Sequence, residues 1–458
     1  MSNPKSLKIV LIGAGSVSFA PTMIRDIFLN DRINSVQLNL CLMDLSETAL
    51  KASEGYAKAV ADKLGRSPSI RSTTDLAASL EGADFVITAI EKNRYYYWSQ
   101  DFHVPRKYGF KQIYGENGGP GGMFHTLRNL PPMLEIAHAM ERICPDAWLI
   151  NFTNPEAKII EAISKLTKIK CVGLCHGIGM GLEQLSQMLE IPEEELETVA
   201  CGLNHFAWFQ SIKHKKTGED LYPLLKRKER EIPWLALWDE IGISRIMLRT
   251  YGLYPYPGTN HIGEYVRWSE EYLASTRMQY FYDPATENPW KSGSIPDFVY
   301  SIGHMEPKPL FGEEKAANPM ENSFRLTDGE LQASHEQAVP IIESIAFGVT
   351  NENLTVNTPN RGKIPDLPHD MVVEVPAYAD GEGIHPLQME ALPTAITEMI
   401  RVQGAIHKLV IEAYVEQSRN KLLQALLLDP TISTYNNAVA LINEMCEIQK
   451  EILPPLHW

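Results

Sequence analysis

The stretch Lys8-Ile9-Val10-Leu11-Ile12-Gly13-Ala14-Gly15-Ser16 decides the fold of the N-terminal half of the chain. Its apolar, β-branched start is typical of a buried strand, and the glycines predict a tight turn. Apolar residues then recur at helical spacing over residues 19–28. In a strand–turn–helix context the first glycine permits the turn and the second lets backbone amides approach a pyrophosphate, so the stretch predicts a dinucleotide site. The third glycine of such a fingerprint is missing, and Ser18 or Phe19 stands near its place.

A second predicted strand ends on an acidic residue. Residues 36–43 form an apolar run, and Asp44 follows it directly. An acidic side chain at this place accepts hydrogen bonds from the adenosine ribose, which favours NAD over NADP. Asp44 is equally suited to cap a helix that starts near Ser46-Glu47, and both interpretations stay open.

Strand and helix patterns alternate through residues 1–200. Apolar runs at 83–89 and 147–151 each follow a segment with helical spacing, and the run at 168–174 is followed by a helix-forming stretch at 181–189. Such alternation predicts a parallel sheet with right-handed crossovers. We therefore predict an α/β fold in which residues 1–200 form a Rossmann-like, doubly wound parallel sheet that binds NAD.

The pattern of the second half predicts that residues 201–458 form a mixed, mostly helical α+β domain. We expect this domain to carry the substrate and oligomer contacts. Helical spacing is present at 221–247, 329–347, 390–424 and 434–451, with a short strand at 372–376. Residues 284–318 are rich in proline and polar side chains and predict an irregular segment.

Composition excludes several classes of protein. The 458 residues carry a formal net charge of −15, which argues against nucleic acid as a partner because nucleic-acid binding needs a basic face. No apolar stretch approaches the roughly twenty residues that a membrane span requires, and the N-terminus shows no signal-peptide core. Six cysteines without regular spacing do not predict a disulfide framework. We expect a cytoplasmic protein with reduced thiols and no membrane partner.

Cys175-His176-Gly177 ends the apolar run at 168–174, where a strand of an open α/β sheet presents its carboxyl end. Further along the chain comes Gly202-Leu203-Asn204-His205. Cys175 and His205 would make a soft sulfur–nitrogen pair suited to a divalent transition metal. From these residues alone, a buried structural cysteine beside a core histidine explains the pattern at least as well.

Two further segments present polar groups near the same edge. Tyr114-Gly115-Glu116-Asn117-Gly118-Gly119-Pro120-Gly121-Gly122 is too rich in glycine for regular structure and opens a helix that carries Arg128. Its amides could hold an anionic or hydroxylated ligand, and a plain flexible loop is the alternative. Asn154 precedes Pro155, which predicts an extended residue with its amide toward the cofactor crevice.

Taken together and in this order, the motifs resemble those of the NAD- and metal-dependent glycosidases of glycoside hydrolase family 4. The matching pieces are Ile12-Gly13-Ala14-Gly15-Ser16, Gly119-Pro120-Gly121-Gly122, Asn154-Pro155, Gly173-Leu174-Cys175-His176-Gly177, Gly202-Leu203-Asn204-His205, Glu264-Tyr265-Val266-Arg267 and Val373-Glu374-Val375-Pro376. The resemblance covers nearly the whole chain, and it implies that Cys175 and His205 are the metal ligands.

The resemblance implies hydrolysis through oxidation and elimination, outside the usual scheme of two carboxylates. NAD accepts a hydride from C3 of the sugar, Mn²⁺ on the C2 and C3 oxygens stabilises the enediolate, and a base removes the C2 proton. The glycosidic oxygen then leaves C1, water adds, and NADH returns the hydride. The resemblance also implies a small-molecule glycoside as substrate and a homodimer or homotetramer, for which the long C-terminal helices could supply an interface.

The family's residue roles carry over one by one. Tyr265 matches the tyrosine that several members use as the C2 base, with a place in the aromatic core as the alternative. His176 is the candidate acid for the leaving oxygen, or it positions the substrate through hydrogen bonds. Asn154 and Arg267 are assigned to the sugar. The implied cofactor contacts are Gly13, Gly15, Ser16, Asp44 and Thr88.

The choice of sugar stays open between related glycosides. Cys175-His176-Gly177 resembles the branch that hydrolyses unphosphorylated α-glycosides, since 6-phosphosugar enzymes usually have aspartate or asparagine in place of His176. Residues 258–265, with a His-x-x-Glu-Tyr pattern, are most similar to α-galactosidases, whereas 357–362 are more similar to α-glucosidases. We predict one of these two activities.

Three alternatives remain. An α-glucuronidase or α-galacturonidase would use the same mechanism and would need a cation for the substrate carboxylate. The candidate cations are Lys92, Arg94, Arg128 and Arg267. The others are a 2-hydroxyacid dehydrogenase, which shares the cofactor fold, and a catalytically inactive NAD-binding sensor.

Overall fold

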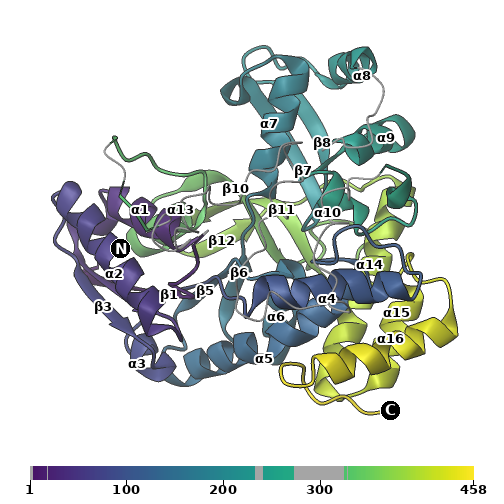
Figure 1. Cartoon of the computed structure of the whole chain (residues 1–458). Helices are drawn as coiled ribbons and strands as arrows, with labels where there is room; N and C mark the ends of the chain where they lie inside the picture. Colours follow the sequence, from purple (N-terminus) through teal and green to yellow (C-terminus); the bar gives the residue numbers. More distant parts are fainter. Residues whose placement is uncertain (1–3, 18, 233–240, 273–323, 327–328) are drawn as a thin grey trace, which may run out of the picture.

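The computed structural model describes residues 4–17, 19–232, 241–272, 324–326 and 329–458. The N-terminal half contains a parallel sheet (Figure 1). Its strands are β1 (Ser6–Ile12), β2 (Gln37–Met43), β3 (Ser69–Thr73), β4 (Phe85–Thr88), β5 (Trp148–Asn151) and β6 (Lys170–Gly173). They lie in the order β3-β2-β1-β4-β5-β6, which is the order of doubly wound dinucleotide-binding sheets. The predicted α/β fold with a Rossmann-like parallel sheet is confirmed.

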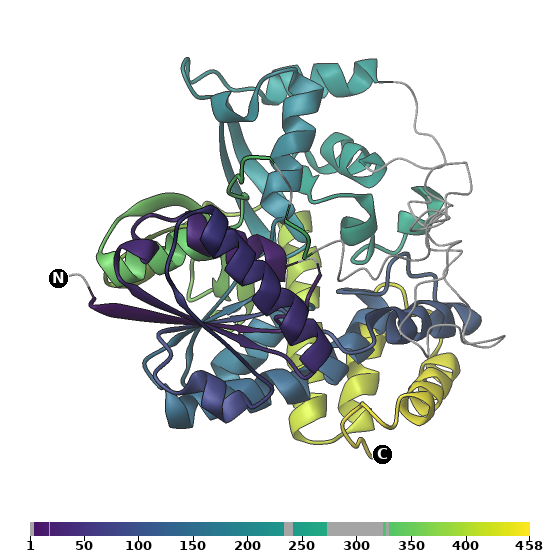
Figure 2. The ribbon, with the colours of Figure 1, turned by 60° about the vertical axis from the view of Figure 1, so that its left-hand side comes forward.

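Helices cover both faces of this sheet (Figure 2). On one face α1 (Ala20–Leu29) packs beside α2 (Glu47–Lys63). The other face carries α3 (Leu76–Leu80), α5 (Gly119–Ile143) and α6 (Glu156–Leu166). Because both faces are covered, the apolar runs of β1 and β4 are almost wholly buried. The sequence order reverses between β1 and β4, and in sheets of this type ligands bind at the carboxyl ends of the strands at that point.

The sheet continues without a break into the second half of the chain. It gains β7 (Leu196–Leu203), β8 (Phe206–His214), β9 (Tyr254–Tyr256), β10 (Asn351–Pro359), β11 (Val372–Asp380) and β12 (Gly383–Pro386). From β6 the order runs β10-β11-β7-β8-β9 with antiparallel pairing, and β12 pairs with β11. The sequence predicted one strand here, at 372–376, and the others were missed. The predicted domain boundary at residue 200 falls inside β7 and stays a prediction.

One row of residues joins the four strands at the middle of the sheet. β10 meets β6 at Asn357 opposite Gly173, and β11 meets β7 at Glu374 opposite Gly202. Asn357 and Glu374 are paired with each other across β10 and β11. A Cβ added to either glycine would lie less than 3.0 Å from a neighbouring atom. Gly173 therefore leaves room for the Glu156 carboxyl group on α6, and Gly202 leaves room for Phe206 and Ala207 of β8.

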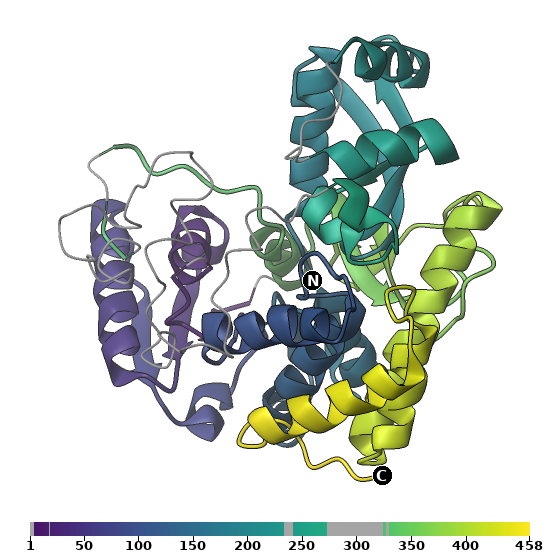
Figure 3. The same cartoon turned by 45° about the vertical axis from the view of Figure 1, so that its right-hand side comes forward.

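The remaining helices form two groups. Around β7, β8 and β9 lie α7 (Gly177–Leu189), α8 (Tyr222–Glu231), α9 (Gly242–Tyr251) and α10 (Thr259–Gly263). Against the sheet, α5 and α6 lie α4 (Arg94–Lys107), α13 (Ala338–Phe347), α14 (Thr394–Val415), α15 (Arg419–Leu428) and α16 (Tyr435–Ile448) (Figure 3). Short 3₁₀ turns occur at Ile33–Ser35, Glu193–Glu195 and Ser269–Tyr272. Within the described residues, no helix has the length and apolar character that crossing a membrane requires.

The predicted helix positions agree with the structure except at one place. The patterns at 221–247, 390–424 and 434–451 correspond to α8 with α9, to α14 with α15, and to α16, and residues 233–240 of the first pattern lie outside the described residues. The helix predicted at 329–347 is wrong in its first part, because α13 begins only at Ala338. Asp26 on α1 accepts hydrogen bonds from the Ser334 amide, at 3.0 Å, and from its hydroxyl, which holds the preceding segment out of helical geometry. The irregular segment predicted at 284–318 lies outside the described residues.

Candidate active site

Cys175 and His205 lie side by side at the carboxyl end of β6. The row from Gly173 to Gly202 brings their strands together just before them in the sequence. Cys175 Sγ is 3.4 Å from His205 Nε2. His205 occupies the tight turn between β7 and β8 with a φ of 63°, a left-handed conformation that is costly for a non-glycine residue and clusters at functional sites. The structure thus assembles the predicted sulfur–nitrogen pair.

The chemical state of this pair suits a cation. Burial lowers the pKa of His205 well below its ordinary value, and His205 Nδ1 is buried without a hydrogen-bond partner. The ring is therefore neutral, which is the form that binds metals. Burial, and then the Glu374 carboxylate, raise the pKa of the Cys175 thiol. A thiolate at neutral pH consequently needs a bound cation.

The Glu374 carboxyl group connects three parts of the site through hydrogen bonds. Its Oε2 accepts hydrogen bonds from Asn204 Nδ2 at 3.0 Å and from Asn357 Nδ2 at 3.3 Å, and its Oε1 accepts one from the Tyr256 hydroxyl at 2.7 Å. Because Asn204 precedes His205, this buried carboxyl holds the β7–β8 turn against β10, β11 and β9. An acidic residue inside an apolar strand pattern was the sequence signal for such a role.

Two residues that the sequence analysis did not propose as ligands reach the same place. Glu116 comes from the glycine-rich loop before α5, and His261 comes from α10. Within the described ranges, Glu116, His205 and His261 form a group whose ligand atoms lie within 4.8 Å of one another. The centroids of the two imidazole rings are 4.3 Å apart. The loop at 114–122 therefore brings a carboxylate to the site.

The same loop is fixed by Glu264, the residue that caps α10. Glu264 Oε1 accepts hydrogen bonds from the backbone amides of Glu116 at 2.6 Å and Asn117 at 3.0 Å. Burial, and then the Glu116 carboxylate, raise the pKa of Glu264 to about 8. The loop amides do hold an acidic group, as the glycine pattern suggested, but that group belongs to the chain itself.

Tyr265 is buried beside the pair. Its hydroxyl donates a hydrogen bond to the Asn204 carbonyl oxygen at 3.3 Å, and its ring stacks on Phe206 with centroids 5.2 Å apart. Burial, and then Glu264, raise the pKa of Tyr265 well above its ordinary value. A neutral phenol is a poor base, so the predicted role at C2 depends on a nearby cation.

The other predicted catalytic and sugar-binding residues lie at different depths. His176 precedes α7 with 60% of its side chain exposed, and its Nδ1 is 3.9 Å from Glu336 Oε1. Asn154 is half-buried, and its carbonyl oxygen accepts a hydrogen bond from Asn129 Nδ2 at 2.7 Å. Arg267 is exposed. His176 is thus open to a ligand, and its acidic neighbour Glu336 was missed by the sequence analysis.

The glycine turn after β1 has the tight form that the sequence predicts. Gly13 has a φ of 85°, and a Cβ there would lie 2.2 Å from the Ala89 carbonyl oxygen. The Asp44 carboxylate accepts hydrogen bonds from the Gly15 amide at 2.8 Å and the Ser46 amide at 2.9 Å. Asp44 therefore stabilises the glycine turn and the start of α2 through hydrogen bonds. The Gly15 amide is already hydrogen-bonded to this side chain. Contact of Asp44 with a ribose stays a prediction.

Ser16 and Thr88 flank this turn. Ser16 Oγ accepts a hydrogen bond from the Phe19 amide at 3.3 Å, at the start of α1. Thr88 ends β4, and its hydroxyl donates to Asn151 Oδ1 at 2.9 Å. Both residues lie at the carboxyl edge of the sheet, where the cofactor contacts are predicted. Both side chains also form hydrogen bonds within the chain.

Two of the four cations considered for a substrate carboxylate are already paired with acids. Arg94 forms ion pairs with Glu91 and Glu116, and these carboxylates raise its pKa above the ordinary value although burial opposes the rise. Arg128 is buried and donates hydrogen bonds to Asp101 at 3.2 and 2.7 Å. The other two candidate cations are exposed.

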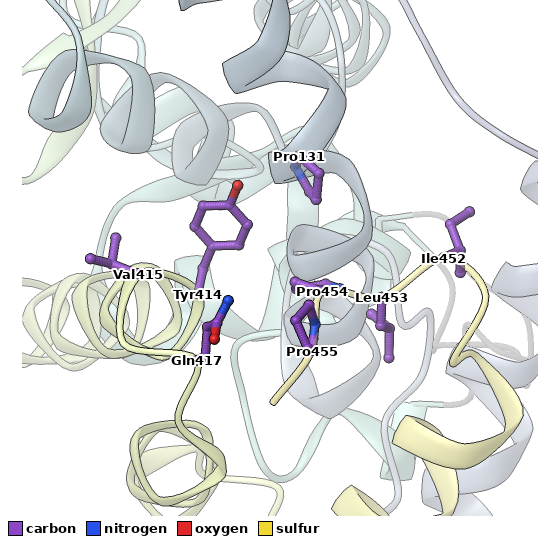
Figure 4. Close-up of a pocket in the computed structure, with 8 residues that line it drawn as sticks. All are labelled: Pro131, Tyr414, Val415, Gln417, Ile452, Leu453, Pro454 and Pro455. Carbon is purple, nitrogen blue, oxygen red and sulfur yellow. The ribbon is translucent and has the colours of Figure 1, made fainter. Parts of the chain in front are cut away.

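A separate cavity of about 530 Å³ lies at the surface of the C-terminal helices (Figure 4). Its lining consists of Pro131, Tyr414, Val415, Gln417, Ile452, Leu453, Pro454 and Pro455. These side chains are mostly apolar, and none of them belongs to the group around Cys175 and His205. The cavity is therefore not part of the candidate active site.

Comparison with known proteins adds the family to this geometry. The family model described as family 4 glycosyl hydrolase matches residues 8–191, and the model of the family 4 glycosyl hydrolase C-terminal domain matches residues 200–432. The chain belongs to glycosyl hydrolase family 4. The resemblance drawn from the motifs is thereby confirmed.

Related family 4 glycosyl hydrolases differ in their sugars. An α-glucosidase of Erwinia rhapontici is 31% identical, with 96% of each chain covered. An α-galactosidase of Bacillus subtilis (strain 168) is 30% identical, again with 96% of each chain covered. Other relatives are named α-galacturonidases. The relatives therefore agree on an α-glycosidase family and differ in the glycone.

Solved structures of the family share the fold. A 6-phospho-α-glucosidase from gut microorganisms, in complex with NAD and Mn²⁺, has a TM-score of 0.77 at 22% identity, covering 99% of this chain and 100% of that chain. A 6-phospho-β-glucosidase from Thermotoga maritima, with manganese, NAD⁺ and glucose-6-phosphate, has a TM-score of 0.76 at 21% identity, covering 98% and 100%. The likeness shows that this family 4 chain has the same architecture.

The residues that the sequence analysis of this family 4 chain missed have one property in common. They are carboxyl or imidazole groups from segments outside the apolar strand runs. Glu116, His261, Glu264 and Glu336 are of this kind. The spacing His-x-x-Glu in α10 was noticed as a mark of substrate type, and it was the available signal for two of them.

Proposed function

We propose that this family 4 glycosyl hydrolase cleaves an unphosphorylated, uncharged α-glycoside, either an α-glucoside or an α-galactoside, with NAD and Mn²⁺ as cofactors. The observation that carries the proposal is the 3.4 Å contact between Cys175 Sγ and His205 Nε2 at the carboxyl end of a dinucleotide-type sheet. Relatives named α-glucosidase and α-galactosidase support it, as do structural neighbours in complex with NAD and Mn²⁺.

The cofactors, when bound, supply a hydride acceptor for C3 of the sugar and a Lewis acid for its C2 and C3 oxygens. Cys175 and His205 hold the cation. Tyr265 would take the C2 proton as the phenolate that a bound cation stabilises, after its own hydroxyl proton has left, and His176, which is exposed beside the site, would give a proton to the leaving glycosidic oxygen. Asn154 and Arg267 orient the sugar. The cofactor is held by Gly13, Gly15, Ser16, Asp44 and Thr88.

The charge around the site favours a neutral glycone. Glu116, Glu264 and Glu374 are all buried close to the Cys175–His205 pair. Arg94 is already paired with two carboxylates. A uronate or a 6-phosphate needs a cationic partner in the site, and Arg94 is already neutralised by Glu91 and Glu116.

An α-glucuronidase or α-galacturonidase is the second candidate, because it uses the same mechanism and some relatives are named α-galacturonidase. Such an enzyme requires Lys92 or Arg267 to reach the substrate carboxylate, since Arg94 and Arg128 are committed to acidic partners. Membership of family 4 leaves a 2-hydroxyacid dehydrogenase without support.

The test is a screen of aryl α-glucoside, α-galactoside and α-galacturonide with the full-length, reduced protein. Each substrate is offered with and without NAD and with and without Mn²⁺. We expect release of the aryl group from one neutral sugar only when both cofactors are present. Hydrolysis of the uronide alone would contradict the neutral glycone, and activity without NAD would contradict the oxidation mechanism.

A matched pair of cysteine variants serves as control for this screen. Cys175→Ser should lose more than about 100-fold in activity, because a metal ligand is replaced. Cys446→Ser changes a half-buried thiol on α16 and should retain the wild-type rate. Equal activity of the two variants would contradict the ligand role of Cys175.

We also propose a homodimer or homotetramer that works in the cytoplasm. The six cysteines are free thiols, and Cys175 has to stay reduced to bind a metal. Several exposed apolar side chains belong to α14, α15 and α16, and one of them, Val415, lines the cavity of Figure 4. They include Val415, Leu427, Leu428 and Tyr435. Such a surface suits self-association.

A further inference from the structure

Helix α5 carries two buried polar side chains near its start, His125 and Asn129. They are four residues apart, so they lie on one face of the helix. Each is 3% exposed, and two of their neighbours on the helix, Phe124 and Leu127, are apolar and fully buried. A buried imidazole and a buried amide need polar partners. The partners of this pair come from three segments around the candidate active site.

His125 connects the glycine-rich loop with the end of β4. Its Nδ1 donates a hydrogen bond to the Glu116 carbonyl oxygen at 2.8 Å, since a carbonyl oxygen can only accept. Its Nε2 lies 2.7 Å from Glu91 Oε2, and Glu91 follows the end of β4 by three residues. Thr88, a predicted cofactor contact, is the last residue of that strand. One imidazole ring therefore spans the loop that carries Glu116 and the strand end where the cofactor is expected.

The Glu91 carboxylate fixes the orientation of that ring. Burial alone would raise the pKa of this carboxyl group, but the adjacent His125, Arg128 and Arg94 lower it to about 2. An ionised carboxylate can only accept, so His125 Nε2 donates a charge-assisted hydrogen bond to it. Arg94 is 3.7 Å from Glu91 and also pairs with Glu116. The loop and the end of β4 are thus connected twice.

Asn129 extends the connection to a third segment. Its Nδ2 donates a hydrogen bond to the Asn154 carbonyl oxygen at 2.7 Å and lies 3.0 Å from His125 Nε2. Asn154 follows β5, the strand that pairs with β4, and it is assigned to the sugar. In sheets of this type, ligands bind at this edge. The two side chains on α5 therefore join the expected cofactor segment to the expected sugar segment.

We propose that His125 is a positioning residue that, together with Asn129, sets where the sugar lies relative to the NAD cofactor. The inference rests on the proposed function, in which C3 of the sugar passes a hydride to NAD. Hydride transfer needs close approach of the two reacting carbons, and a displacement of about 1 Å can cost roughly 100-fold in rate. His125 acts through the segments that it holds and is assigned no contact with either ligand.

The test compares His125→Gln with His138→Gln, the same substitution at an exposed position of the same helix. Full-length protein with NAD and Mn²⁺ is given the aryl α-glucoside or α-galactoside that the screen identifies, carrying either hydrogen or deuterium at C3. In His125→Gln we expect kcat to fall by roughly 10- to 100-fold and the C3 isotope effect to exceed that of the wild type, because hydride transfer becomes the slower step. His138→Gln should match the wild type in both measurements.

The isotope effect distinguishes positioning from a merely structural role. Partial unfolding lowers kcat but leaves the isotope effect unchanged, because the effect is a ratio of two rates on the same protein. A lower kcat with the wild-type isotope effect would therefore overturn the inference. If His125→Gln fails to fold, Asn129→Leu decides by the same measurement, since it removes the hydrogen bond to Asn154 and keeps the ring of His125.

Hydrogen exchange followed by mass spectrometry separates this inference from the proposed function, because it needs neither cofactor nor sugar. In His125→Gln we expect faster exchange confined to residues 89–92 and 114–118, with wild-type exchange elsewhere. Unchanged exchange in these two segments would overturn the inference whatever the activity of the enzyme. If the wild type hydrolyses no glycoside in the screen, the proposed function fails, and the exchange comparison alone decides whether His125 holds the two segments.

Discussion

The carboxyl group of Glu156 is buried without a partner. Its side chain is 1% exposed, and neither oxygen takes part in a hydrogen bond. Burial, and then the nearby Glu374, raise the pKa of Glu156 well above its ordinary value. In the folded chain the group therefore keeps its proton at pH values where the unfolded chain releases it, and folding becomes less favourable as the pH rises through that interval.

Replacing Glu156 by methionine should stabilise the protein increasingly above about pH 5. Between the unfolded-state pKa near 4.3 and the raised folded-state pKa, the wild type loses about 1.4 kcal/mol per pH unit relative to the variant. Urea denaturation across this interval should show the difference in free energy of unfolding widening with pH. Glu135→Met, at an exposed position of α5, is the control and should show no such trend. A difference that is constant with pH would contradict a protonated Glu156.

The sequence could predict two of the residues that lie together at the candidate metal site. Cys175 and His205 were found because each belongs to a recognisable motif. Each also lies two residues after the end of a strand, β6 or β7, which fixes its position. Glu116 and His261 reach the site through a glycine-rich loop and a short helix whose paths depend on tertiary packing. Glu264 fixes that loop, and a bond between residues so far apart in the chain leaves no local periodicity to detect.

Helix α7 follows the Cys-His-Gly motif and shows how glycines set the distance between elements. A Cβ on Gly181 would lie 2.8 Å from Tyr256 Cβ and 3.0 Å from the Phe209 ring. On the same helix, a Cβ on Gly179 would meet no atom within 4 Å. Gly181 therefore permits α7 to pack closely on β8 and β9, whereas Gly179 has no packing role that a methyl group would disturb.

Alanine substitutions at these two glycines should have opposite effects. Gly179→Ala should raise the free energy of unfolding by up to about 1 kcal/mol, because alanine is the better helix former. Gly181→Ala should lower it by about 1–3 kcal/mol, because the added methyl group overpacks the contact with β8 and β9. Chemical denaturation of the two variants beside the wild type measures both. Stabilisation by Gly181→Ala would show that the contact can relax.

The elements themselves differed in how far the sequence predicted them. The parallel strands β1, β4 and β5 were recognised because both faces are buried and their sequences are continuous apolar runs. β10 was missed because Asn351–Pro359 contains three asparagines and a glutamate, residues that are uncommon in strands. Its position is set by pairing with β11 and by the buried Asn357–Glu374 contact, which are tertiary effects.

Across the whole molecule, a buried ion pair links the C-terminal helices to the rest. Arg128 on α5 and Asp101 on α4 are paired at 2.7 Å, and both side chains are almost completely buried. Gln449, directly after α16, donates a hydrogen bond to Asp101 at 3.0 Å and accepts one from Arg128 at 3.0 Å. The ion pair between α4 and α5 is thus joined to the residue that follows α16, far along the chain.

Asp101→Asn should destabilise the protein by about 3–5 kcal/mol, because it leaves the Arg128 charge buried without its counter-ion. The double variant Asp101→Leu/Arg128→Met should be much closer to the wild type, since the charge and its counter-ion are removed together. Glu447→Gln breaks an exposed pair with Lys450 and should change the free energy of unfolding by less than about 0.5 kcal/mol. Thermal and urea unfolding provide the comparison, and equal loss in the single and double variants would contradict this account.

The strand order also determines when the chain can finish folding as it leaves the ribosome. β6 and β7 are consecutive along the chain, yet β10 and β11 lie between them in the sheet. Until residues 351–380 have been synthesised, the nascent β6 keeps an open edge of unpaired backbone groups, which is where growing chains aggregate. Cys175 and His205, made early on opposite sides of that gap, become neighbours only late in translation.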